Sequence, residues 1–168
     1  MSIRKVKRVA ILEDHPDWVL DFAQRFNQEY NGHARIGDIW YLPDPEADDD
    51  TYEVVIREAG FTPHRIDAFS LQWLEFDKIL KACDILLMDY DIGYSDSSAV
   101  HFLSEELWNG ASVEDRRKIF VYTSIDNYAP SVATAFGDKA VPAHREPGST
   151  ETKVYVEGNT RLKDLCMV

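Results

Sequence analysis

A short apolar run that ends in an acidic residue constrains this chain more than any other feature. Residues 85–88 read Ile-Leu-Leu-Met, and Asp89 follows at once. A run so short and so apolar is typical of a strand buried on both faces, and such strands lie inside parallel sheets. In open α/β sheets, ligands bind just beyond the carboxyl ends of the strands. The sequence therefore predicts that Asp89 lies at the ligand-binding edge of such a sheet.

Other segments carry a similar strand signal, and amphipathic patterns separate them. The predicted strands are 9–12, 65–69, 85–89, 119–122 and 140–143, and the predicted helices are 16–30, 51–59, 73–80, 97–109 and 127–136. This alternation predicts an α/β fold with a doubly wound, five-stranded parallel sheet. Residues 31–50, which contain two prolines and an acidic run, are predicted to form an insertion. Pro142 restricts the last strand to a sheet edge or a bulge.

Length, charge and cysteine content narrow the class of protein. The 168 residues favour a single domain (1–168), with a core at about 6–147 and an atypical tail at 148–168. A formal net charge of −12 argues against a nucleic-acid partner, because such binding needs clustered lysine and arginine. The two cysteines lack metal-type spacing and indicate a reducing compartment. The first apolar stretch is too short to span a membrane, so we expect a cytoplasmic protein without a membrane partner.

The predicted strand ends bring oxygen-bearing side chains together. Glu13 and Asp14 end the first strand, and Asp89 ends the central one. Thr123 follows the strand at 119–122. Two carboxylates about 4 Å apart repel by roughly 4 kcal/mol at an effective dielectric near 20. Such a cluster favours a divalent cation with oxygen ligands, Mg²⁺ or Mn²⁺, which could hold a phosphoryl group in line with an aspartate oxygen.

Three segments, in this order, resemble the response-regulator receiver domains of two-component signalling. They are Ile11-Leu12-Glu13-Asp14-His15-Pro16, Asp84-Ile85-Leu86-Leu87-Met88-Asp89 and Phe120-Val121-Tyr122-Thr123-Ser124. The resemblance covers most of residues 6–147 outside the insertion. It implies a flavodoxin-like fold with strand order 2-1-3-4-5.

The resemblance also implies a role for each residue of the cluster. Asp89 is the phosphoacceptor and a metal ligand, Asp14 binds the metal directly, and Glu13 acts on it largely through water. The backbone carbonyl of Asp91 completes the protein ligands, and the Thr123 hydroxyl moves toward the phosphate. The phosphoryl donor would be a sensor histidine kinase or a phosphotransfer protein, and a downstream protein partner would respond. A homodimer is compatible with the resemblance, because receivers commonly dimerise through their fourth and fifth helices.

The chain departs from the receiver pattern after the last predicted strand. Receivers carry a Lys-Pro pair there, whose ammonium pairs with the acceptor and the phosphate. Depending on the anchor residue, the corresponding position here is His144, Arg145 or Glu146. Arg145 is the predicted substitute, because a guanidinium group can grip phosphate in a bidentate manner.

Three functions remain open on the sequence. The first is a phosphoacceptor receiver domain, which catalyses no more than its own phosphorylation and dephosphorylation and changes its protein contacts when Asp89 is phosphorylated. The second is a pseudo-receiver that acts as a phosphorylation-independent interaction module, since the lysine is missing. The third is a haloacid-dehalogenase-like phosphatase, in which Asp89 and Asp91 would be nucleophile and acid. No later strand ends in the paired acids of that family, which ranks it third.

Overall fold

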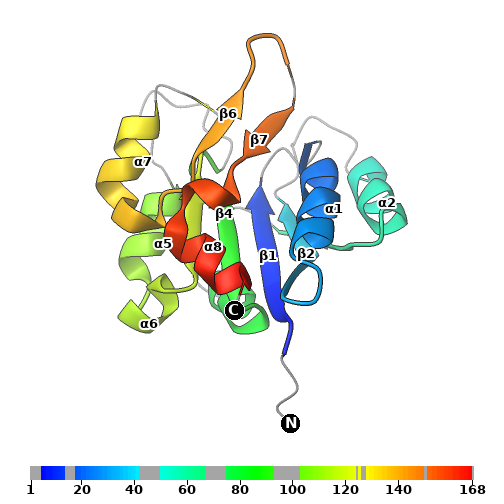
Figure 1. The fold of residues 1–168 in the computed structure, drawn as a ribbon, viewed down its shortest axis with the longest axis horizontal. Coiled ribbons are helices and arrows are strands. Elements are labelled where there is room, and N and C mark those ends of the chain that lie inside the picture. Colours follow the sequence, from blue (N-terminus) through cyan, green and yellow to red (C-terminus); the bar gives the residue numbers. More distant parts are fainter. Residues whose placement is uncertain are drawn as a thin grey trace.

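A parallel sheet of five strands forms the centre of the protein (Figure 1). The computed structural model describes residues 5–13, 18–41, 50–66, 75–92, 103–123, 125, 128–149 and 151–167. The strands are β1 (Lys7–Glu13), β2 (Ala34–Tyr41), β3 (Thr62–Arg65), β4 (Ile85–Asp89) and β5 (Ile119–Tyr122). Their order in the sheet is β3-β2-β1-β4-β5, and all neighbours run parallel. The predicted α/β fold with a five-stranded parallel sheet is confirmed.

Helices cover both faces of this sheet. They are α1 (Val19–Glu29), α2 (Asp50–Glu58), α4 (Phe76–Ala82), α5 (Leu103–Gly110), α6 (Val113–Arg116), α7 (Ala129–Phe136) and α8 (Thr160–Met167). Buried side chains of α1, α2 and α8 pack on one face, and those of α4, α5 and α7 pack on the other. Within the described residues, no helix is long and apolar enough to cross a bilayer.

The middle residues of the central strands are apolar because both faces of these strands are buried. In β1, Val9 and Ile11 point into the core beneath α1, whereas Ala10 and Leu12 point into the core beneath α4. This division follows from the alternation of side chains along a strand. It explains why residues 9–12 of β1 and 85–88 of β4 include no polar position.

Residues 34–41, predicted to belong to an insertion, form the strand β2 between β1 and β3. The prediction failed because Arg35, Gly37 and Asp38 interrupt the apolar pattern. The β1–β2 register shifts at Gly37, and the Asn27 side chain exchanges two hydrogen bonds with the backbone of Ile36 at that irregularity (2.7 and 3.0 Å). Residues 42–49 lie outside the described residues.

The strand order therefore differs from the predicted 2-1-3-4-5. The strand expected at 65–69 shares only Arg65 with β3 (Thr62–Arg65), which pairs with β2 instead of with β1. Ile66 follows that strand, and residues 67–69 lie outside the described residues. The unit formed by α2 and β3 extends the sheet by one strand beyond β2.

The last predicted strand, 140–143, is reduced to one parallel bridge between Val121 and Ala140. Pro142 has no N–H group to continue the ladder, and its carbonyl accepts a hydrogen bond from the Tyr155 N–H at 2.8 Å. The chain then forms an antiparallel hairpin of β6 (Ala143–Arg145) and β7 (Thr152–Val154). Figure 1 shows this hairpin projecting beyond the carboxyl ends of the central strands.

The C-terminal tail is part of the core. Asn159 caps α8, because its Oδ1 accepts a hydrogen bond from the Leu162 N–H (2.9 Å) while its Nδ2 donates to the carbonyls of Asp138 and Ala140 (2.9 and 2.7 Å). Leu162 and Cys166 are fully buried against the same face of the sheet as α1. The atypical tail predicted at 148–168 thus supplies a strand and a helix.

The packing of α8 can be tested by truncating its central leucine. We expect Leu162→Ala to lower the free energy of unfolding by about 3 kcal/mol, because the lost methyl groups leave a cavity. Met167→Ala in the same helix, where the side chain is 48% exposed, should change it by less than about 0.5 kcal/mol. Urea titration of both variants measures the difference, and equal values would contradict the observed docking of α8.

Candidate functional site

Glu13, Asp89 and Tyr122 form the carboxyl-edge site, a row across the ends of β1, β4 and β5. Leu12 pairs with Met88, so Glu13 and Asp89 are the next residues on their two strands, and Asp89 pairs with Tyr122. The three residues are only 3%, 5% and 2% exposed. By alternation their side chains lie on the face that α1 and α8 cover.

This row lies where the winding of the sheet reverses. From β1 the chain builds β2 and β3 on one side, and it then crosses to build β4 and β5 on the other. The crevice outside the carboxyl ends at such a switch point is where open α/β sheets bind their ligands. Glu13 and Asp89 end the two strands that flank it.

A hydrogen bond across the row holds Glu13. The Tyr122 hydroxyl donates to Glu13 Oε2 at 2.6 Å, although β4 separates their strands. Trp18 packs edge-on against the Tyr122 ring, with 5.6 Å between ring centroids, and is itself buried. A charge-assisted bond of this length, shielded from water, fixes the carboxylate in place.

The residues after Asp89 are anchored on the opposite face of the sheet. The Ser104 hydroxyl donates to the Tyr90 carbonyl at 2.6 Å, and the Tyr90 hydroxyl donates to Glu105 at 3.3 Å. Burial, followed by the nearby Glu105 carboxylate, raises the pKa of Tyr90 to about 12. The Asp91 N–H donates to Asp89 Oδ1 at 3.3 Å, so the acidic turn folds back on the strand end.

The donor set suits a hard divalent cation. Glu13 and Asp89 provide two buried carboxylates on adjacent strands, and oxygen ligands of this kind are those that Mg²⁺ prefers. Asp91, whose carbonyl is the third predicted ligand, follows two residues after Asp89. Asp14, the predicted direct ligand, lies outside the described residues, and within those residues no three acidic, His or Cys side chains gather as a metal site.

Thr123 is the first residue after β5 and is 7% exposed. Its Oγ1 accepts a hydrogen bond from the Ile125 N–H at 3.2 Å, which leaves the hydroxyl proton able to donate. Ser124, the small neighbour in the receiver pattern, lies outside the described residues.

The residues considered as lysine substitutes lie on or beside the β6–β7 hairpin. Both the Nε and an Nη atom of Arg145 donate to Thr152 Oγ1, at 3.0 and 2.9 Å, within that hairpin. His144 pairs with Glu146 at 3.1 Å. The residue that follows the bridge at Ala140, and so stands beside Tyr122, is the apolar Val141.

Sequence reasoning missed the contribution of Tyr122, which was interpreted as a strand residue. Tyr122 and Glu13 are 109 residues apart, so no local pattern links them. One signal was available, because a buried tyrosine hydroxyl needs a hydrogen-bond partner. Glu13 and Asp89 were the candidates at the ends of the neighbouring strands.

Comparisons with known proteins assign no family to this chain. No family model and no curated protein sequence matches it. A solved structure with a related arrangement is a lactate dehydrogenase from Eimeria maxima with NADH and oxamate, at 10% identity and a TM-score of 0.42. The match covers 87% of this chain, and the chain spans 45% of that enzyme. A likeness of this size is no guide to activity.

The hydrogen bond between Tyr122 and Glu13 can be tested by removing the hydroxyl. We expect Tyr122→Phe to lower the free energy of unfolding by about 1–3 kcal/mol, because a buried carboxylate loses its donor. Tyr155→Phe, at a tyrosine that is 39% exposed, is the matched control and should have little effect. Chemical denaturation with EDTA present measures both, and equal stabilities of the two variants would count against the bond.

Proposed function

We propose that this protein is a receiver-type signalling domain whose Asp89 accepts a phosphoryl group in a Mg²⁺-dependent reaction. The observation that carries the proposal is the position of Asp89. It is the buried last residue of a central parallel strand, it lies beside Glu13, and it stands at the switch point of the sheet.

The receiver fold is proposed together with the function. If the α2–β3 unit is taken as an addition, the remaining order is β2-β1-β4-β5 followed by the Ala140 segment. That is the order 2-1-3-4-5 of flavodoxin-like sheets. The insertion in this chain would then be α2 and β3 instead of residues 31–50.

The proposed reaction is a phosphoryl transfer from a histidine of a kinase or a phosphotransfer protein. An Asp89 carboxylate oxygen attacks phosphorus, the bond from phosphorus to the donor nitrogen breaks, and that nitrogen retains the electron pair. Mg²⁺, held by Asp89, Glu13, Asp14 and the Asp91 carbonyl, would neutralise the phosphoryl oxygens. Thr123 donates its hydroxyl proton to a phosphoryl oxygen, and Tyr122 keeps Glu13 in position. A water molecule later hydrolyses the acyl phosphate and resets Asp89.

A second function, a pseudo-receiver, is favoured by the cationic residues around the last strand. Arg145 is hydrogen-bonded to Thr152, and Val141 occupies the position beside Tyr122. Lys139 donates to the carbonyls of Arg116 and Arg117, before β5, and therefore lies at the amino end of the sheet. In this alternative the protein binds its partner without phosphorylation.

Phosphorylation of Asp89 gives the first test. We expect the protein to gain one phosphoryl group from a small acyl phosphate such as acetyl phosphate with Mg²⁺, and to bind beryllofluoride saturably. Asp89→Asn should abolish both, and EDTA should do the same, because the transfer needs the carboxylate and the cation. Intact-mass spectrometry and intrinsic tryptophan fluorescence, to which the buried Trp18 contributes, are the readouts.

Asp77→Asn, at an exposed aspartate on α4, is the matched control and should behave as wild type. A wild-type protein that neither gains mass nor responds to beryllofluoride would overturn the receiver proposal and leave the pseudo-receiver.

Arg145 can be tested separately. Because its guanidinium is engaged by Thr152, we expect Arg145→Ala to change beryllofluoride affinity by no more than about two-fold. A loss of about ten-fold or more, as for a bidentate contact to phosphate, would assign Arg145 the role of the missing lysine. Titration of both proteins under the same Mg²⁺ concentration distinguishes the two outcomes.

A further inference from the structure

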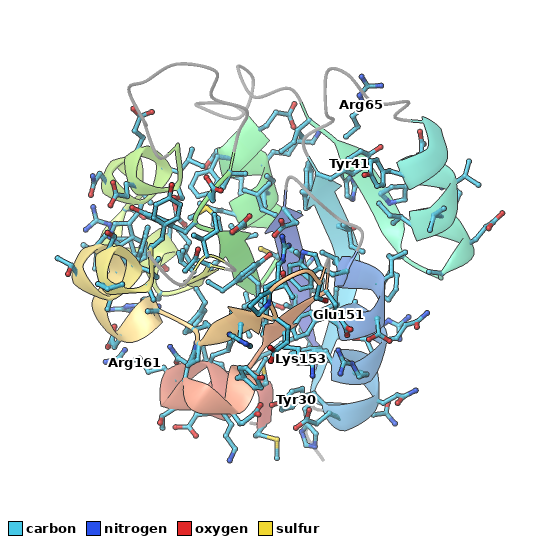
Figure 2. The ribbon with its side chains drawn as sticks, turned by 90° about the horizontal axis from the view of Figure 1, so that it is seen from above. Tyr30, Tyr41, Arg65, Glu151, Lys153 and Arg161 are labelled. Atoms are coloured by element: carbon cyan, nitrogen blue, oxygen red, sulfur yellow. The ribbon has the colours of Figure 1, made fainter. Side chains whose placement is uncertain are left out.

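A cavity of about 390 Å³ lies beneath α8, near the amino ends of the central strands. Lys7 opens β1 and Arg117 precedes β5, whereas Arg161 and Leu165 come from α8. We call it the basic cavity, because four of its seven lining residues are basic and one is acidic. In Figure 1, α8 lies across the sheet in front of β4, and Figure 2 shows Arg161 on that helix.

The basic cavity contrasts with the chain as a whole, whose net charge is −12. Three of its four cations already have partners: Arg161 pairs with Asp138 at 2.6 Å, Lys7 donates to the Leu165 carbonyl, and Lys139 donates to two backbone carbonyls. Arg117 is exposed, and in the part of the chain that the structure describes no ion pair engages its guanidinium. A concentration of positive charge in an otherwise acidic protein favours the binding of an anion.

Lys139 lies at the base of this cluster and is only 7% exposed. Its ammonium donates to the carbonyls of Arg116 and Arg117 (2.9 and 2.8 Å) and lies 4.4 Å from the centre of the Phe120 ring. Burial lowers the pKa of Lys139 to about 8. Repulsion by Arg161 and Arg117 acts in the same direction, whereas attraction to Asp138 opposes it. Lys139 is therefore close enough to Arg161 and Arg117 to be repelled by both, and a bound anion would offset that repulsion.

We propose that the basic cavity binds a small phosphorylated molecule, with its phosphate between Arg117 and Arg161 and its organic part against the half-buried Leu165. Guanidinium groups suit the bidentate recognition of phosphate. The volume falls in the range typical of small-molecule sites, and Leu165 provides apolar surface for the rest of the ligand. The site lies at the other end of the sheet from Asp89 and does not depend on its phosphorylation.

AMP and inorganic phosphate are suitable probes in Mg²⁺-free buffer with EDTA, which keeps the carboxyl-edge site out of the measurement. We expect AMP to bind saturably in calorimetry, and to shift the amide resonances of Phe120 and Leu165. Arg117→Gln and Arg161→Gln should each weaken binding about five-fold, the size expected for one partly exposed ion pair.

The controls are matched by exposure and by location. Arg57 on α2 is as exposed as Arg161, 64% for each side chain, and it too pairs with an acidic residue, so Arg57→Gln should bind AMP as wild type does. Asp89→Asn should also bind AMP normally, which separates this proposal from the receiver function.

Several outcomes would overturn the proposal. These are the absence of saturable AMP binding, resonance shifts confined to the carboxyl-edge site, or affinities unchanged in the folded Arg117→Gln and Arg161→Gln proteins. Equal affinity for AMP and for inorganic phosphate would refute the role of Leu165.

Discussion

The register of β1, β4 and β5 determines where every polar group of the carboxyl-edge site lies. Because Leu12 pairs with Met88 and Asp89 pairs with Tyr122, the three ends of these strands are level. Side chains alternate along a strand, so a slip of one residue in β4 would move Asp89 to the face covered by α4 and α5. The apolar residues before Asp89 prevent that slip, since both of their faces are buried. The hydrophobic core thus sets the position of the Asp89 carboxylate.

Burial of acidic residues at this edge has a cost that the surrounding hydrogen bonds offset. A carboxylate taken out of water is unfavourable unless it is hydrogen-bonded or neutralised. For Glu13, the Tyr122 hydroxyl supplies one such bond, and the Trp18 ring packs against that tyrosine. The proposed cation would add to this compensation, because its charge would neutralise the carboxylates.

The elements with a continuous local signal could be predicted, and those held by distant contacts could not. The apolar runs of β1, β4 and β5 were recognised because each is uninterrupted. β2 was missed because its polar residues and its register shift at Gly37 are stabilised by Asn27 of another element. In the site, Glu13 and Asp89 were expected together from the strand pattern, whereas the link from Tyr122 depends on packing across three strands.

The first strand and the last helix are joined at the same end of the molecule. Lys7 of β1 donates a hydrogen bond to the carbonyl of Leu165 in α8, and Figure 1 shows the start of β1 and the end of α8 in the lower part of the view, with the β6–β7 hairpin at the top. A fluorescent label or a neighbouring domain attached at either end would consequently lie at the end of the molecule opposite Asp89. A docking protein could then approach the acceptor carboxylate from above without meeting that attachment.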